Sequence, residues 1–366
     1  MSGNRRHISL NRPFAMHRGG ELDGVRIAYE TWGELNKRRD NAILLFTGLS
    51  PSAHAASASE DQSPGWWEDM IGPGRAIDTD RYFLICVNSL GSCFGTTGPS
   101  SVNPDTEETY RLTFPILSIE DIAQCGADVI EVLGIDQVAY VIGPSMGGMS
   151  ALAFAMMHPD RAAGLILISS AARALPFAIA MRSLQREIIR SDPEWNDGQY
   201  QGHGAEQGMH LARKLGMVSY RSADEWKQRF GRERAPADEY RHPDQPFGIE
   251  FEIESYLEHH ARKFSGSFDA NCYLYLSRAM DLFDAADHGG CLETGLACVK
   301  ASRVLIVGVT SDILFPVEQQ RELAALLQVP DRELVFEQLS SNQGHDSFLV
   351  DMDRFRPVLS RFLNAG

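Results

Sequence analysis

The chain has 366 residues, of which 43% are hydrophobic and 23% are charged, the balance of an ordinary soluble globular protein. Its formal net charge of −15 argues against duplex nucleic acid or an anionic membrane as a partner, because either would need a basic surface. No apolar run is long enough to span a membrane and the N-terminus lacks an apolar segment, so we expect no membrane span, no signal peptide and a cytoplasmic location.

The cysteines predict neither a metal site nor a disulfide framework. They lack the Cys-x-x-Cys spacing that is typical of zinc sites, and disulfides are rare in a reducing cytoplasm. We therefore expect no bound metal ion and six buried thiols, which belong to Cys86, Cys93, Cys125, Cys272, Cys291 and Cys298.

The N-terminal part of the chain predicts one edge of a β-sheet followed by inner strands. Residues 14–32 alternate apolar and polar side chains around a Gly-Gly pair, which predicts an antiparallel hairpin at the sheet edge. Residues 41–50 predict an inner strand that runs into a glycine-containing loop, and residues 82–88 predict the next strand. Residues 119–133 have helical periodicity, with Ser118 as the expected N-cap.

The segment that follows predicts a buried strand and a helix joined by a very sharp turn. Residues 138–157 contain the pattern Gly-x-Ser-x-Gly at that turn, which is the pattern of a nucleophile elbow. Its two glycines allow the sharp turn and the close packing of the helix, so Ser145 projects as the candidate nucleophile. The amide of Met146 then faces any oxyanion that forms at Ser145.

A second oxyanion-hole amide is expected in the loop that follows the first inner strand. This is where an α/β-hydrolase places it, and Leu49 is our candidate. An ordinary strand-to-loop turn at Leu49 is the alternative.

Residues 163–170 predict a further buried strand, after which the pattern changes. From residue 175 to residue 296 the chain is helical and rich in arginine and aromatic residues, without a parallel-strand run. A long insertion between two core strands is typical of a cap or lid. We predict an α/β-hydrolase fold in which residues 1–174 and 297–366 form the core, a mostly parallel sheet flanked by helices, and residues 175–296 form a helical lid.

Two late strands lead to residues that complete a catalytic triad in the chain order Ser, Asp, His. Arg303–Val309 is an apolar strand that leads to Asp312, and Glu333–Leu339 is a strand that leads to His345. We expect His345 to act as the base for Ser145 and Asp312 to orient the imidazole. Taken alone, each has another interpretation, since Asp312 could simply cap a turn and His345 could be a solvated loop residue.

Five motifs follow one another along the chain, Thr47–His54, Gly91–Pro99, Gly143–Met149, Ala178–Arg186 and Gly344–Phe348. In this order they resemble the homoserine O-acyltransferase family of the α/β-hydrolase superfamily nearly end to end, whereas ordinary esterases share only the elbow. The resemblance implies transfer of an acyl group from an acyl-CoA to the side-chain hydroxyl of homoserine or serine. It also implies a homodimer that packs through the lid, and no permanently bound cofactor.

The same resemblance implies two residues that bind an amino-acid substrate. Arg213 would bind the carboxylate of the substrate, and Asp346, next to the catalytic histidine, would bind its ammonium group. From the residues alone, Arg213 could equally be a surface cation, and Asp346 could cap the helix that begins near Ser347.

Two of the motifs depart from the homoserine acetyltransferase pattern and resemble the serine O-succinyltransferase branch. A short loop in the first motif would then help to set substrate choice, and an arginine in the fourth would pair with the carboxylate of a succinyl group. Alternatively, that arginine could pair with a carboxylate of the lid. The residues concerned are Leu49, Ser50, Pro51 and Ser52 in the first motif and Arg182 in the fourth.

We therefore predict an L-serine O-succinyltransferase that makes O-succinyl-L-serine for cysteine biosynthesis through an acyl-Ser145 intermediate. Succinyl-CoA and L-serine are the expected substrates. A homoserine or serine O-acetyltransferase that uses acetyl-CoA is the first alternative, and a carboxylester hydrolase is the second. A non-catalytic binding protein is disfavoured, because such proteins usually lose a member of the triad.

Overall fold

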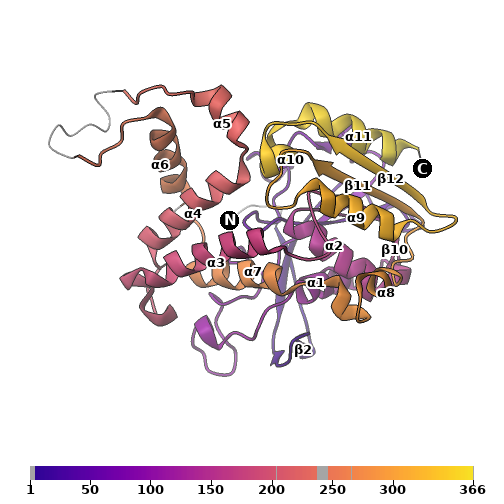
Figure 1. Ribbon diagram of the computed structural model, residues 1–366. Helices are drawn as coiled ribbons and strands as arrows, with labels where there is room; N and C mark the ends of the chain where they lie inside the picture. The colour runs from indigo at the N-terminus through magenta and orange to yellow at the C-terminus, as the bar shows by residue number, and fades with distance from the viewer. Residues whose placement is uncertain (1–4, 203, 237–245, 265, 366) are drawn as a thin grey trace.

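The computed structural model of the chain describes residues 5–202, 204–236, 246–264 and 266–365. Its centre is an eight-stranded sheet with the strand order β1-β4-β8-β5-β9-β10-β11-β12 (Figure 1). Strand β4 pairs antiparallel with β1 and with β8, and the other neighbours pair in parallel, which confirms the predicted α/β-hydrolase fold. The strands are β1 (Arg6–Ser9), β4 (Arg26–Trp32), β8 (Phe83–Val87), β5 (Ala42–Phe46), β9 (Val138–Pro144), β10 (Ala162–Ile168), β11 (Arg303–Val309) and β12 (Glu333–Leu339).

The N-terminal edge of the sheet differs from the prediction. A hairpin does form around the Gly-Gly pair, but its strands, β2 (Phe14–Ala15) and β3 (Glu21–Leu22), make a separate two-stranded sheet. The edge strand of the main sheet is β1, which the sequence pattern did not reveal because Ile8 is its one buried residue. A second short pair, β6 (Ile71–Gly72) and β7 (Ile77–Asp78), lies between β5 and β8 in the chain.

Helices cover both faces of the sheet, because successive side chains of a strand point to opposite sides. Leu44 of β5 belongs to the core shared with α1, α2 and α9, whereas its neighbour Ile43 belongs to the core shared with α11. The side chain of Ser118 caps α1 as predicted, by accepting a hydrogen bond from the amide of Asp121. The bounds of these helices are α1 (Ile119–Val132), α2 (Met146–Met157), α9 (Val317–Leu327) and α11 (Met352–Asn364).

Between β10 and β11 the described residues form helices joined by loops, and most of these helices lie to one side of the sheet in Figure 1. Helix α3 packs on α4 and α7, and α6 packs on α4 and α5. The last part of the insertion packs on the core instead. Helix α8 contacts η4 and also α9 of the core. The elements are α3 (Pro176–Ser191), η3 (Pro193–Gly198), α4 (Glu206–Tyr220), α5 (Ala223–Phe230), α6 (Glu252–Phe264), α7 (Ala270–Leu282), η4 (Ala285–His288) and α8 (Leu292–Leu296).

None of the helices in the described part of the chain is long and apolar enough to cross a membrane. All six cysteines are free thiols. The prediction that they are buried is confirmed for Cys86, Cys125 and Cys272, whereas Cys93 is only partly buried. It is wrong for Cys291 and Cys298, which are exposed because they flank the short surface helix α8 rather than lying on a core strand or helix face.

Two glycines allow α2 to approach the sheet very closely. A Cβ at Gly147 would lie 2.3 Å from the carbonyl oxygen of Phe46, the last residue of β5. A Cβ at Gly143 would lie 1.9 Å from the carbonyl oxygen of Gly147. Only glycine fits at these two positions, so the start of α2 is held between the ends of β5 and β9.

We expect Gly147→Ala to lower the free energy of unfolding by about 1 to 3 kcal/mol, because the methyl group would overpack a contact between two backbone segments. Urea denaturation followed by circular dichroism measures the change. Gly48→Ala is the matched control, since its Cβ would have no neighbour closer than the Cδ of Pro51 at 3.8 Å. A loss in Gly147→Ala no larger than in this control would contradict the argument.

Candidate active site

Ser145 stands at the turn between β9 and α2 in a backbone conformation that most residues avoid. Its φ and ψ angles are 56° and −125°, and its N–H donates to the carbonyl of Ile168 in the neighbouring strand at 2.9 Å. The strand ends and the helix begins at this one residue, so its side chain projects from the apex of the turn. Nothing in the structure explains the proline that precedes it, Pro144.

A chain of hydrogen bonds joins the three residues of the predicted triad. His345 Nε2 lies 2.7 Å from Ser145 Oγ, and His345 Nδ1 lies 2.7 Å from Asp312 Oδ2. The other carboxylate oxygen of Asp312 accepts hydrogen bonds from the amides of Leu314 and Phe315, each at 2.9 Å. Asp312 therefore caps a turn, as the alternative interpretation held, and positions the imidazole as well.

Burial and charge act in opposite directions on the imidazole of His345. Burial lowers its pKa, but the negative charges of Asp312 and Asp346 raise it by more, so the pKa lies above the ordinary value of a histidine. All three members of the triad are buried, with Ser145 the most exposed at 8%. A base of this kind can take the proton of the serine hydroxyl and give it to a leaving group.

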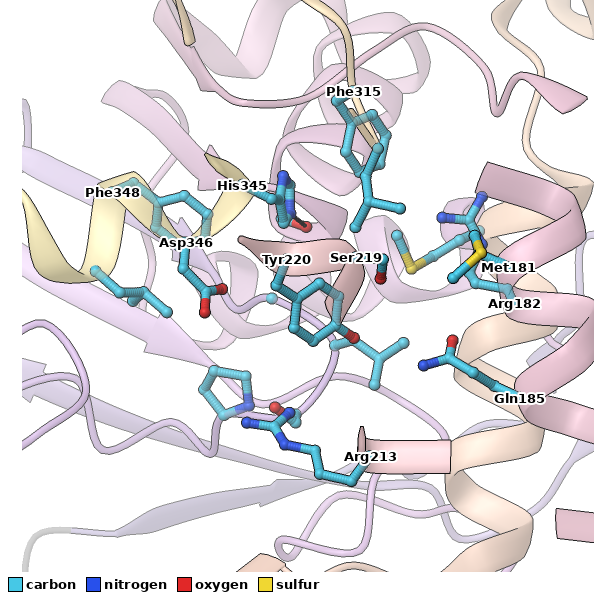
Figure 2. Close-up of a pocket in the computed structure, with 18 of the residues that line it drawn as sticks. Met181, Arg182, Gln185, Arg213, Ser219, Tyr220, Phe315, His345, Asp346 and Phe348 are labelled. Carbon is cyan, nitrogen blue, oxygen red and sulfur yellow. Dashed lines mark hydrogen bonds between the residues drawn. The ribbon is translucent and has the colours of Figure 1, made fainter. Parts of the chain in front are cut away.

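Ser145 lines a cavity of about 130 Å³, whose other lining residues come from both the core and the helical insertion. In Figure 2, Arg182 and Gln185 project from α3 on one side, and His345 and Asp346 lie on the opposite side. The other side chains of the lining are mostly apolar or aromatic. They include Trp66, Met181, Tyr220, Tyr273, Met280, Leu314, Phe315, Phe348 and Leu349.

Two backbone amides are available to an oxyanion at Ser145. Met146 is the first residue of α2, so its N–H has no partner within the helix and lies at the positive end of the helix dipole. Leu49 lines the cavity in the loop after β5, and the close contact of Gly147 with the end of β5 places this loop beside the elbow. The oxyanion-hole roles of both amides stay predictions, with which this placement agrees.

Arg182 combines the two interpretations that the sequence left open. Its Nε donates to Asp281 of α7 at 2.6 Å, and Arg186 contacts the other oxygen of the same carboxylate at 2.6 Å. Arg182 nevertheless lines the cavity, and its buried Nη2 has no hydrogen-bond partner among the described residues. Because two guanidinium groups share one carboxylate, a net positive charge and an unused donor remain beside the cavity.

Arg213 and Asp346, the predicted sites for a carboxylate and an ammonium group, both line the cavity. The guanidinium of Arg213 lies 4.6 Å from the ring centroid of Phe264, and its Nε is buried without a hydrogen-bond partner in the described part of the chain. Asp346 pairs with Arg221, whose Nε is 3.3 Å from Oδ2. The alternative that Asp346 caps the next helix, α10 (Ser347–Val350), is wrong, because its side chain makes no capping hydrogen bond.

The loop predicted to set substrate choice lies only partly in the cavity. Leu49, Ser50 and Pro51 line it, whereas Ser52 lies outside the lining. The carbonyl of Ser52 accepts a hydrogen bond from the indole of Trp66, which does line the cavity. Ser52 is therefore linked to the cavity only indirectly, through its backbone contact with Trp66.

Sequence reasoning missed four polar side chains of the lining, Gln185, Ser219, Tyr220 and Tyr273. Gln185 stands one turn after Arg182 in α3, and Tyr220 stands two turns after Arg213 in α4, so each shares a helix face with the arginine. Helical spacing from the two arginines could have found them. Tyr273 comes from α7, which the sequence gives no reason to align with the other two helices.

A second cavity of about 370 Å³ adjoins the first, since Arg213 and Asp346 line both. Its walls are basic and aromatic. The pKa of His260 in this wall lies below the ordinary value, because of burial and then because of the positive charges around it. The side chains that give this character are Arg213, Arg221, His260 and Lys263, with Trp226, Tyr256 and Phe264.

Comparison with known proteins gives three consistent findings. The family model described as "alpha/beta hydrolase fold" matches residues 41–351. The serine O-succinyltransferase of Litchfieldella anticariensis is 56% identical over 361 residues, which cover 98% of this chain and 98% of that protein. Among solved structures, homoserine O-acetyltransferase from Bacillus anthracis has a TM-score of 0.89 at 28% identity and covers 98% of this chain and 97% of its own, and esterase E22 has a TM-score of 0.87 at 29% identity and covers 98% and 99%.

We expect Asp312→Asn to lower the rate at which an activated ester, p-nitrophenyl acetate, acylates Ser145 by about 10⁴-fold, because the imidazole loses the carboxylate that fixes its tautomer. The wild-type rate should fall as the pH decreases through the raised pKa of His345, because a protonated imidazole cannot accept the serine proton. The variant lacks the largest charge that raises this pKa, so its fall should occur at lower pH. Stopped-flow rates between pH 5 and 9 would measure both effects, a range set about the ordinary histidine pKa.

Asp353→Asn is the control for this measurement, because that carboxylate lies in α11 with its side chain 94% exposed. This variant should have the wild-type reaction rate, and the rate should decrease at the same pH as in the wild type. Retention of the wild-type rate and pH profile by Asp312→Asn would show that the carboxylate does not act on the imidazole.

Proposed function

This chain belongs to the α/β-hydrolase fold family and, within it, to the serine O-succinyltransferases, and we propose that it transfers a succinyl group from succinyl-CoA to the hydroxyl of L-serine. It is thus an acyltransferase. The observation that carries the choice of acyl group is the buried Nη2 of Arg182, which lacks a hydrogen-bond partner among the residues that the structure describes and belongs to the lining of the cavity that holds Ser145. The product, O-succinyl-L-serine, has an activated hydroxyl, which suits a place in cysteine biosynthesis.

The reaction proceeds through an ester on Ser145. In the first half, Ser145 Oγ attacks the thioester carbonyl while His345 Nε2 takes its proton, and the amides of Leu49 and Met146 stabilise the oxyanion by about 3 to 4 kcal/mol each. The carbon–sulfur bond then breaks, and His345 gives the proton to the departing CoA thiolate. In the second half, His345 takes the proton of the hydroxyl of the substrate L-serine, whose oxygen attacks the ester carbonyl. The bond between the acyl carbon and Ser145 Oγ then breaks, and His345 returns the proton to Oγ.

The charge distribution near Arg182 favours a donor that ends in a carboxylate. Asp281 is shared between Arg182 and Arg186, so the group as a whole carries one surplus positive charge. A succinyl carboxylate would accept from the unused Nη2 in a charge-assisted hydrogen bond, which an acetyl group cannot offer. An acetyl donor would leave this donor group buried and unpaired.

Arg213 and Asp346 supply the opposite charges that a free amino acid needs. The guanidinium of Arg213 would pair with the carboxylate of L-serine, and Asp346 with its ammonium group. Asp346 stands next to His345 in the chain, so a substrate held there presents its hydroxyl to the base. Burial raises the pKa of Asp346 even though Arg221 and His345 lower it, and a bound ammonium group would favour the ionised form.

The second cavity is the place that we propose for the phosphates and the adenine of CoA. It shares Arg213 and Asp346 with the lining of the first cavity, and its walls combine cations with aromatic rings. Phosphates bind to guanidinium and ammonium groups, and an adenine stacks on an aromatic ring. The thioester would then reach Ser145 by passing Arg213.

The helical insertion, residues 175–296, serves in this proposal as a lid that keeps water from the acyl-enzyme. This distinguishes the proposal from a carboxylester hydrolase, which uses the same triad and needs water as the acceptor. The likeness to both a homoserine O-acetyltransferase and an esterase shows that one fold accompanies either activity. The side chains of the cavity therefore decide the donor and the acceptor.

We further propose a homodimer that packs through the lid and a cytoplasmic location. Phe177 and Leu184 of α3 are exposed, as are Leu211 and Val218 of α4. The members of each pair are seven residues apart, so each pair presents one apolar helix face that a second copy could cover. Six free thiols suit a reducing compartment.

We expect Arg182→Ala to lower kcat/KM for succinyl-CoA by about 10- to 100-fold, because it removes a charge-assisted hydrogen bond to the acyl group. The value for acetyl-CoA should change little, so the preference between donors should shrink. Steady-state kinetics with both donors, each with L-serine and L-homoserine as acceptor, measures the four values.

Arg190→Ala is the matched control, because Arg190 is an exposed arginine of the same helix, α3, and does not line the cavity. It should leave the preference for succinyl-CoA intact. Wild-type preference for acetyl-CoA would overturn the succinyl assignment, and release of free succinate at the same rate with and without L-serine would favour a hydrolase.

We expect Lys263→Gln to raise KM for succinyl-CoA about tenfold, because it removes a cation from the wall of the second cavity. KM for L-serine should not change. With the truncated donor succinyl-N-acetylcysteamine, which lacks the phosphates and adenine, variant and wild type should behave alike. Lys300→Gln, on a lysine paired with Asp160 outside both cavities, is the control. If Lys263→Gln raised KM equally for succinyl-CoA and for the truncated donor, the phosphates of CoA would not bind in the second cavity.

A further inference from the structure

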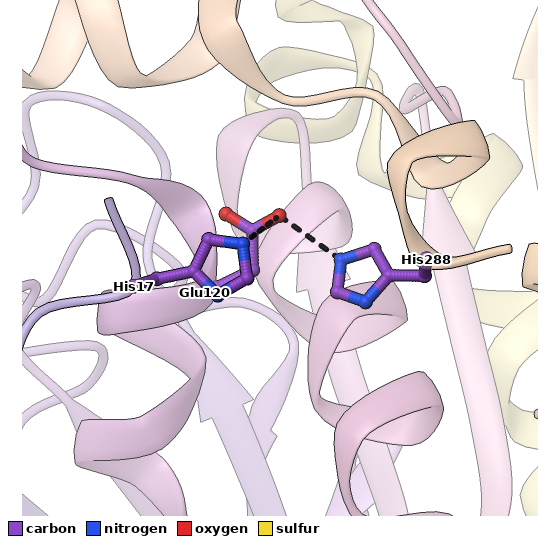
Figure 3. A group of neighbouring side chains, drawn as sticks. All are labelled: His17, Glu120 and His288. Carbon is purple, nitrogen blue, oxygen red and sulfur yellow. Dashed lines mark hydrogen bonds and ion pairs between the residues drawn. The ribbon is translucent and has the colours of Figure 1, made fainter. Parts of the chain in front are cut away.

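A cluster of two histidines and one glutamate lies at the start of α1 (Figure 3). His17 comes from the turn between β2 and β3, Glu120 is the second residue of α1, and His288 is the last residue of η4. One ligand atom from each side chain lies within 4.8 Å of the other two. None of the three lines either cavity, so the proposed reaction does not account for them.

The geometry of the cluster resembles that of a metal site. Nε2 of His288 is 3.0 Å from Oε1 of Glu120, and Nε2 of His17 is 3.8 Å from the same oxygen. The two imidazole rings have centroids 5.7 Å apart. Two imidazoles on one tetrahedral zinc ion have ring centres about 5 Å apart, so a small rotation of the exposed His17 side chain would complete the arrangement.

Hydrogen bonding within the cluster accounts for only one oxygen of Glu120. The residue is 2% exposed, and its Oε2 is buried without a hydrogen-bond partner in the described ranges. A buried carboxylate oxygen without a hydrogen-bond partner, beside two imidazoles, is well suited to bind a cation.

Neighbouring groups hold the ligands in place without competing for this position. The carboxylate of Asp121 accepts a hydrogen bond from the backbone N–H of His17 at 2.7 Å, which fixes the hairpin turn on the start of α1. The guanidinium of Arg18 donates to the carbonyl of Leu282 at 2.7 Å and lies 3.7 Å from Asp287. Its positive charge is therefore partly compensated outside the cluster.

We propose that His17, Glu120 and His288 form a binding site for a divalent transition metal ion of the zinc type. Two imidazole nitrogens and one carboxylate oxygen are ligands that Zn²⁺ takes, and they leave a fourth position for water on the solvent side of His17. Magnesium and calcium prefer sites built from oxygen alone, so they do not fit this set. The expectation of no metal rested on cysteine spacing, which gives no information about histidines that only folding brings together.

The site has a structural consequence, because its ligands come from three segments that lie far apart in the chain. A metal ion there joins the N-terminal hairpin, the first core helix and the end of the helical insertion. Since the unfolded chain does not hold these residues together, binding stabilises the folded state. The ion is not a reactant, and the proposal is independent of the acyl donor and acceptor.

Zinc binding to the full-length protein tests the proposal. The background is the double variant Cys291→Ser, Cys298→Ser, because exposed thiolates also bind zinc. After treatment with a chelator, isothermal titration with Zn²⁺ should show one ion per chain, and the thermal unfolding midpoint should rise by several degrees. Cobalt(II), used as a probe, should show the visible absorption of a tetrahedral site without a sulfur-to-metal charge-transfer band.

His288→Ala and Glu120→Gln should each weaken zinc binding at least about tenfold and abolish the shift in unfolding midpoint. Glu120→Gln is the sharper variant, because it keeps the shape of the side chain and removes its charge. His259→Ala, on an exposed histidine of α6, should bind zinc as the background does. Absence of binding in the background protein, or unchanged binding in Glu120→Gln, would overturn the proposal.

Discussion

The closeness of α2 to the ends of β5 and β9 is the constraint on which the active site depends. The backbone carbonyl of Phe46 occupies the space that a side chain at position 147 would need, so glycine at this position lets the elbow lie against the end of β5, just before the loop that contains Leu49. This contact places Ser145, the amide of Met146 and the loop of Leu49 at one point above the sheet. The histidine and the aspartate arrive at the same point because β11 and β12 run parallel to β9 and end at the same edge.

Charge is distributed around the cavity in a way that ordinary core packing would not require. Arg182 and Arg186 share the single carboxylate of Asp281, and Arg213 is covered by an aromatic ring and has no carboxylate partner among the residues that the structure describes. Buried cations without full compensation destabilise a fold, since they lose their hydration. Such an arrangement is understandable where anionic groups bind, and both proposed substrates carry them.

The sequence predicted those parts of the molecule that depend on local pattern. The strands β11 and β12 have the bounds that their apolar runs indicate, and the elbow and the order Ser145, Asp312, His345 follow from motifs. Features that depend on contacts between distant segments could not be predicted from the sequence. Strand β1 has only one buried residue, so its sequence shows no strand pattern. The exposure of Cys291 depends on the packing of α8. Tyr273 reaches the cavity from α7, whose orientation is set by the tertiary fold.

Arg213 and Asp346 stand at the boundary of the two cavities, and this position has a kinetic consequence. In the proposed function, the pantetheine part of CoA passes the same two side chains that later bind the amino acid. The acyl donor and the amino acid therefore cannot occupy this boundary at the same time, and they bind to the enzyme in turn. At high concentration, L-serine would bind to this boundary before the acyl donor does, so excess L-serine would inhibit the formation of the acyl-enzyme.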